Sequence, residues 1–63
     1  MFYIIEARKL KPGDWIRNGR LAPLHVVSVE WTRDAEIKVR HDFGNGGEPA
    51  TSFYRHDETV VLT

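Results

Sequence analysis

The chain has 63 residues, with nine basic and nine acidic side chains, no cysteine, and a hydrophobic content of 41%. This length predicts one domain over residues 1–63, which buries only about 60% of the surface that the unfolded chain exposes. The lack of cysteine excludes disulfide bonds and thiolate metal sites, and the zero formal charge argues against a general polyanion binder.

The apolar start of the chain predicts a strand over residues 2–7, because aromatic and β-branched residues dominate it. The apolar run stops at Glu6, which is too short for a secretory leader, and no run approaches the length of a membrane-spanning helix. We therefore expect a cytoplasmic chain that does not contact a membrane. Residues 7–10 have room for one helical turn before Pro12.

A turn and a second strand are expected next. In the Lys-Pro-Gly-Asp sequence at positions 11–14, the proline fixes φ at the first corner of a turn and the glycine tolerates the second. Asp14 can hydrogen-bond back to nearby amides. Trp15 and Ile16 favour a strand over residues 15–17, which ends at the turn signal Asn18-Gly19.

The middle of the chain alternates between apolar and polar residues. Residues 20–24 contain Pro23 and are interpreted as a loop. Residues 25–31 predict a strand with one buried face. The residues placed on that face are Val27, Val29 and Trp31.

After a polar reversal at residues 32–35, the clearest two-residue period of the chain covers residues 36–43. This period predicts a strand on which one face holds Ile37, Val39, His41 and Phe43. Three glycines within residues 44–47 then predict a loop, because glycine lowers the stability of regular elements.

The last third of the chain predicts two strands, at residues 51–55 and 60–62, with Phe53 and Tyr54 on opposite faces of the first. Because large aromatic side chains supply much of the buried area in a small domain, four of them are assigned to the core. These are Trp15, Trp31, Phe43 and Phe53.

Five or six short strands with no helical period predict an all-β fold. The expected architecture is a small five- or six-stranded SH3-like barrel that is partly open. A bent sheet that pairs with a second copy of the chain is the alternative, since a two-layer core is thin at this length.

Three segments carry a resemblance to a known group of folds. Residues 10–16 (Leu-Lys-Pro-Gly-Asp-Trp-Ile), 26–30 (Val-Val-Ser-Val-Glu) and 37–40 (Ile-Lys-Val-Arg) resemble the small SH3-like β-barrel modules, which include the KOW and Tudor-like modules. The chain is also similar to short uncharacterised proteins of actinobacteria and their phages. The resemblance covers most of residues 8–62 and implies a barrel scaffold with a binding role.

Few residues point to catalysis or metal binding. The Arg-His-Asp tripeptides at 40–42 and 55–57 offer imidazole and carboxylate ligands, but neighbours in a strand point to opposite faces and are not expected to converge on one ion. No serine or threonine stands in a nucleophile elbow, and residues 44–47 lack the lysine and helix of a phosphate-binding loop. We expect no catalytic residue, metal, cofactor or small-molecule substrate.

The first functional hypothesis is a module that binds another protein, or a second copy of itself, through a sheet edge or through the 21–24 segment. Its candidate contact residues are Leu21, Leu24 and Tyr54. The more frequent role of apolar loop residues is to cap an open barrel end, so that outcome remains open for the two leucines.

The alternative hypothesis is a nucleic-acid-binding accessory protein that uses a basic sheet face. Its candidate residues are Lys38, Arg40 and Arg55, with aromatic side chains available to stack on bases. The alternating signs of the charges along residues 36–42 favour instead a solvated face with ion pairs between strands.

Overall fold

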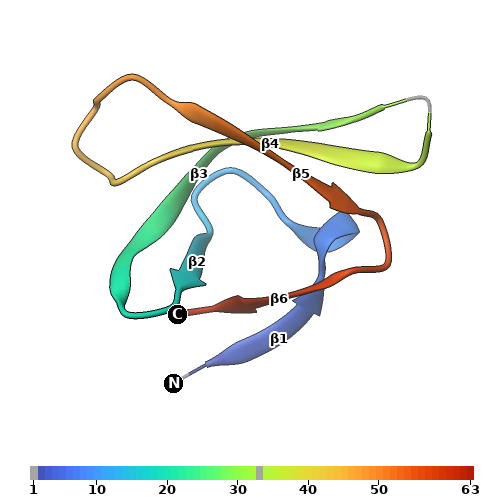
Figure 1. Cartoon of the computed structure of the whole chain (residues 1–63), viewed down its shortest axis with the longest axis horizontal. Helices are drawn as coiled ribbons and strands as arrows, with labels where there is room; N and C mark the ends of the chain where they lie inside the picture. The colour runs from blue at the N-terminus through green and yellow to red at the C-terminus, as the bar shows by residue number, and fades with distance from the viewer. Residues whose placement is uncertain (1, 33) are drawn as a thin grey trace.

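The computed structural model describes residues 2–32 and 34–63 and shows one antiparallel sheet with a short 3-10 turn (Figure 1). In chain order the elements are β1 (Tyr3–Glu6), η1 (Ala7–Lys9), β2 (Trp15–Asn18), β3 (Leu21–Trp31), β4 (Glu36–Asp42), β5 (Ala50–Arg55) and β6 (Thr59–Leu62). Among the described residues, the six strands are hydrogen-bonded in the order β1-β6-β2-β3-β4-β5. The predicted all-β class is confirmed.

The sheet is not closed into a barrel, because its two edge strands, β1 and β5, are not paired with each other. Figure 1 shows β3 as a long curved strand that leads from β2 across to β4 and β5. The amide of Ala7 donates to the carbonyl oxygen of Glu58 at 2.7 Å, and the amide of Arg8 donates to that of His56 at 3.1 Å. The Leu10 amide donates to the Ala7 carbonyl at 3.0 Å, which confirms the helical turn predicted at residues 7–10. The bonds from Ala7 and Arg8 attach this turn to the connection between β5 and β6.

The turn before β2 forms as predicted. The Asp14 amide donates to the Lys11 carbonyl at 3.1 Å, and the Lys11 amide donates to the Asp14 carboxylate at 3.0 Å. Gly13 has a φ of 96°, which a glycine adopts readily at the second corner of a turn. The turn is also bonded to β3, because the Gly13 amide donates to the Val26 carbonyl at 2.9 Å.

The loop predicted at residues 20–24 is wrong, because β3 begins at Leu21. Asn18 pairs with Leu21, so Gly19 and Arg20 alone connect β2 to β3 in a tight hairpin. The strand tolerates Pro23 because β4 pairs with β3 only from His25 onward. One side of residues 21–24 therefore has no partner strand that would require the missing N–H.

A bulge in β3 decides which of its central valines is buried. The register with β4 passes from the pair Val26–His41 to the pair Ser28–Arg40, which leaves Val27 as an extra residue. Val26 is fully buried, whereas Val27 is exposed. The prediction that Val27 lies on the buried face is therefore wrong.

The core is aliphatic rather than aromatic. The buried hydrophobic residues of the described chain are Ala7, Leu10, Ile16, Val26, Ile37, Val39 and Val60. The four aromatic residues predicted to be buried (Trp15, Trp31, Phe43 and Phe53) each have at least 37% of their surface exposed. A single curled sheet of short strands encloses little volume, and small side chains fill it.

The alternation predicted for β4 is confirmed as far as His41, which is buried on the same face as Ile37 and Val39. Phe43 departs from it because β4 ends at Asp42, whose carboxylate accepts the Gly44 amide at 2.8 Å and turns the chain. Phe53 and Tyr54 do lie on opposite faces of β5, since Tyr54 packs against the core and Phe53 is exposed.

Candidate binding surfaces

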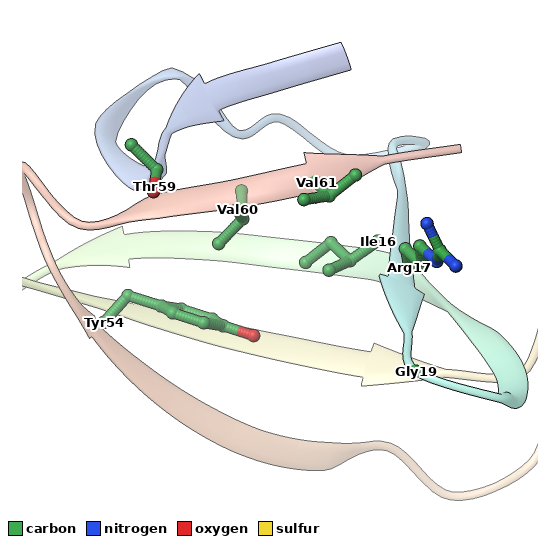
Figure 2. A pocket seen from close by; sticks show the side chains of 7 residues that line it. All are labelled: Ile16, Arg17, Gly19, Tyr54, Thr59, Val60 and Val61. Carbon is green, nitrogen blue, oxygen red and sulfur yellow. The ribbon is translucent and has the colours of Figure 1, made fainter. Parts of the chain in front are cut away.

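An open groove lies inside the curl of the sheet and has a volume of about 460 Å³. It is lined by residues of β2, β5, β6 and the β2–β3 turn, namely Ile16, Arg17, Gly19, Tyr54, Thr59, Val60 and Val61. Figure 2 shows the ring of Tyr54 lying across from Ile16 and Val60. The groove is therefore mainly apolar, with the Tyr54 hydroxyl and Thr59 among its polar groups, and the Arg17 guanidinium is directed away from Ile16, Val60 and Tyr54 (Figure 2).

Burial raises the pKa of the Tyr54 phenol above its usual value, and the charge of Glu58 adds to this effect while a hydrogen bond from Ser52 opposes it. Tyr54 thus holds its proton more tightly than a solvated tyrosine does. Of the three predicted protein contacts, this residue is the one that lies in the groove.

The two leucines predicted to contact a partner have different environments. Leu24 is paired with the buried Ile16 and packs against the core, so it covers the interior of the sheet. Leu21, in contrast, has 71% of its surface exposed. The structure therefore leaves Leu21 accessible and gives Leu24 a packing role.

The predicted basic residues are brought together on the outer face of the sheet, opposite the core. Lys38 pairs with Phe53 across β4 and β5, and Arg55 is two residues from Phe53 on the same face. Arg40 lies on that face as well, opposite Thr51. An exposed phenyl ring on the same face as three cationic side chains is an arrangement that the sequence does not predict, because its pattern assigns Phe53 to the core.

Acidic residues share this outer face. Glu30 lies opposite Lys38, and Glu36 lies opposite Arg55. Arg55 forms an ion pair with Asp57 at 3.5 Å. Within the described part of the chain, neither Lys38 nor Arg40 has a carboxylate within ion-pair distance. The face is thus mixed in charge, although its central cations are not neutralised by contact.

The three histidines each contact a different partner. His25 Nδ1 is 3.2 Å from the Asp42 carboxylate, and His56 Nδ1 is 3.1 Å from the Ala35 carbonyl. His41 Nε2 is 2.8 Å from the Ser52 hydroxyl, but His41 is buried and neither residue of this pair lines the groove. Within residues 2–32 and 34–63, no three acidic or histidine side chains gather closely enough to hold a metal ion.

The β1 edge, which we define as Tyr3 and Ile4 of β1 together with the preceding Phe2, is an exposed apolar surface. Tyr3 has 59% and Ile4 has 72% of its surface exposed. Arg17 lies over the Phe2 ring, with its guanidinium carbon 4.4 Å from the ring centroid. Strand β1 pairs with β6 on one side only, so its other side presents unpaired backbone groups.

The hydrogen-bond pattern of β6 shows which backbone groups of β1 are unpaired. The Thr63 amide donates to the Trp15 carbonyl on the β2 side, so the alternate residue Leu62 directs its backbone groups to β1. Leu62 pairs with Tyr3, and Ala7 is bonded to Glu58 in the same register. Tyr3 therefore bonds to β6, whereas the N–H and C=O of Ile4 point away from the sheet.

Among the described residues, no helix has the length and apolar composition needed to cross a membrane. Comparison of the chain with known protein families, with curated proteins and with solved structures finds no match in any of the three.

Proposed function

We propose that this chain is a small non-catalytic module that binds another protein, and that it recognises its partner as an extended strand at the β1 edge. The observation that supports the proposal is the unpaired side of β1, where Tyr3 and Ile4 are more than half exposed. Strand addition to an open edge gains main-chain hydrogen bonds, and exposed side chains on alternate positions give specificity.

The sequence of β1 supports its use as a binding edge. Protected edge strands carry proline, lysine or inward-pointing charges that discourage pairing with another chain. The run from Phe2 to Ile5 has none of these residues. The only charged residue of β1 is Glu6, at its last position. The opposite edge strand, β5, follows Pro49 and ends in Arg55, so it is better protected.

We also propose that the scaffold is an SH3-like module with an additional N-terminal strand. Strands β2, β3, β4 and β5 form a continuous meander, and β6 returns to pair with β2, which supports this assignment. The turn at residues 11–14, which carries the resemblance, directly precedes β2. In this interpretation β1 is an extension of the module on the far side of β6.

Peptides selected from a random display library on the immobilised chain test the binding proposal. We expect selected peptides with alternating apolar residues, and we expect Ile4→Pro to weaken their binding by roughly tenfold or more. The proline removes an N–H that points away from β6, so the native sheet keeps its own bonds. Leu21→Lys is the matched control, because Leu21 is 71% exposed and Ile4 is 72% exposed. Equal peptide affinity for wild type and Ile4→Pro would show that the site lies elsewhere.

A second candidate function is favoured by Phe53, which is 57% exposed between Lys38 and Arg55 on the outer face. A ring that stacks on a base beside cations that hold phosphates is the usual platform for single-stranded nucleic acids. The test is a salt titration of binding to labelled single-stranded DNA and RNA. Binding that weakens with salt and is lost in Phe53→Ala supports this candidate, whereas no binding at low salt rejects it.

A further inference from the structure

We propose that the partner at the β1 edge is a second copy of this chain, whose β1 pairs antiparallel with the first across a two-fold axis at Ile4. This inference rests on the proposed function, because it identifies the occupant of the same edge. The pairing joins two six-stranded sheets edge to edge into one continuous antiparallel sheet, as closed homodimers with an isologous interface often do.

The backbone of β1 is complementary to itself in this register. The N–H and C=O of Ile4 point away from β6, and the alternation places those of Phe2 and Glu6 on the same side. With Ile4 opposite Ile4, the residue Phe2 of each copy lies opposite Glu6 of the other. Ile4 then exchanges two hydrogen bonds with Ile4 of the other copy, and the Glu6 N–H of each copy donates to the Phe2 carbonyl of the other. The Glu6 carbonyl stays in the first bond of η1, and none of the bonds to β6 is lost.

The side chains are complementary in the same register. Ile5 packs against the core, so Ile4 and Glu6 lie on the opposite, outer face of β1. The two Ile4 side chains therefore meet at the axis, and their contact removes the most exposed large apolar residue from water.

Charge complementarity selects this register over its neighbours. Glu6 of one copy lies opposite Phe2 of the other, and Arg17 lies 4.4 Å from the centroid of the Phe2 ring. Within its own copy Glu6 accepts two hydrogen bonds from Arg8, both at Oε1 (2.8 and 3.1 Å). The other carboxylate oxygen, Oε2, comes beside the Arg17 guanidinium of the second copy. A shift of the pairing by one step in one direction sets Ile4 against Glu6 and leaves Phe2 without a partner, so it loses both the apolar contact and the ion pair. A shift in the other direction sets Ile4 against Phe2, which keeps apolar contacts but leaves Glu6 unpaired and loses its contact with Arg17.

Sedimentation equilibrium on the full chain tests the assembly. Wild type is expected to approach twice the 7.3 kDa chain mass as its concentration rises to about 1 mM. Ile4→Pro and Ile4→Lys are expected to stay monomeric, while Leu21→Lys behaves as wild type. Circular dichroism of each variant verifies that the sheet is intact, and Ile4→Lys replaces the proline variant if that variant unfolds. A wild-type chain that is monomeric at the highest concentration overturns the inference.

A charge exchange tests the register itself. Arg17→Glu and Glu6→Arg are each expected to weaken the dimer, by roughly tenfold, because each places like charges together across the axis. Glu6→Arg also breaks the ion pair of Glu6 with Arg8 of the same copy, so the double variant is compared with Glu6→Arg alone. The double variant Glu6→Arg with Arg17→Glu restores opposite charges between the copies and is expected to dimerise more tightly than Glu6→Arg. Equal or weaker dimerisation of the double variant rejects the Glu6–Arg17 contact.

The two proposals fail in different ways. Peptides that bind at β1 to a chain that stays monomeric leave the proposed function standing and reject the second copy as its partner. A dimer that Ile4→Pro and Ile4→Lys do not weaken rejects β1 as the interface. If the chain neither binds peptides at β1 nor self-associates, both proposals are wrong.

Discussion

The indole of Trp15 packs closely on Gly44, the second residue after β4. The indole packs against the His25 ring, with 4.7 Å between the ring centroids, and it also covers Gly44. Asp42 joins these parts, because its carboxylate contacts His25 at 3.2 Å and accepts the Gly44 amide at 2.8 Å. Gly44 has a φ of 82°, so both its backbone and the space in front of it require glycine.

We therefore expect Gly44→Ala to destabilise the chain more than Gly46→Ala does. Both glycines have positive φ, which costs an alanine about 1–2 kcal/mol, but an added methyl at Gly46 meets no atom within 4 Å. At Gly44 the methyl displaces the outer edge of the Trp15 indole, and loss of the packing of this ring on His25 adds about 0.5–1.5 kcal/mol. Urea unfolding measures both changes, and equal losses for the two variants would contradict the close packing of Trp15 on Gly44.

Tyr54 gives the stability of the chain a dependence on alkaline pH. Burial raises the pKa of its phenol in the folded state above the value of 10.0 for a solvated tyrosine. The folded chain then holds the proton more tightly than the unfolded chain, so this contribution is complete below that value and is lost as pH rises through the folded-state pKa. The urea midpoint of wild type is expected to fall more steeply than that of Tyr54→Phe between about pH 9 and pH 11. Parallel curves for the two proteins would contradict the shift.

At the scale of single elements, strands β4 and β5 show what the sequence predicts well. Their alternation identifies Ile37, Val39 and His41 as buried, and it places Lys38 and Arg40 on the other face. The period works here because β4 and β5 pair with each other without a shift of register and the bulge between β3 and β4 lies in β3, so the parity of each residue number in β4 and β5 fixes its face.

In strand β3 the alternation of apolar and polar residues does not predict which side chains are buried. The bulge at Val27 shifts the parity by one residue, and no residue in the run of valines indicates it. Proline lacks an N–H, so Pro23 predicts a loop, but the strand has an unpaired side there. Both errors have the same cause. The face of a residue near a bulge, and the need for a backbone N–H, depend on which strand pairs with β3 at that position.

The pair of His41 and Ser52 links β4 to β5 inside the sheet. Because His41 is buried, removal of its hydroxyl partner leaves a ring nitrogen unsatisfied. We expect Ser52→Ala to cost about 1–3 kcal/mol in the free energy of unfolding. Thr51→Ala is the control, because Thr51 is exposed on the neighbouring position of the same strand. A double-mutant cycle with His41→Leu should show coupling of about 0.5 kcal/mol or more, and additive losses would contradict the contact.

At the scale of the whole molecule, the strand order decides which candidate surfaces exist. The sequence predicts that residues 2–7 form a strand, but not that this strand lies at an edge, because edges arise from long-range pairing with β6. The same pairing explains the exposure of the aromatic residues. The open sheet has one small interior, which aliphatic side chains fill, and Phe53 lies on the outer face, away from that interior.

The proposed β1 dimer predicts that thermal stability depends on protein concentration. If only folded chains associate, each tenfold rise in concentration above the dissociation constant stabilises the dimer by about 1.4 kcal/mol, or about 0.7 kcal/mol per chain. For a domain of this size, that corresponds to a rise in Tm of about 3–5 °C per tenfold change. Melting curves recorded by circular dichroism from about 10 µM to about 1 mM measure this slope. Ile4→Lys should abolish it and Leu21→Lys should preserve it, because the two residues are equally exposed but only Ile4 lies on the proposed axis. A wild-type Tm that stays constant over this range, or a slope that Ile4→Lys leaves unchanged, would contradict pairing through β1.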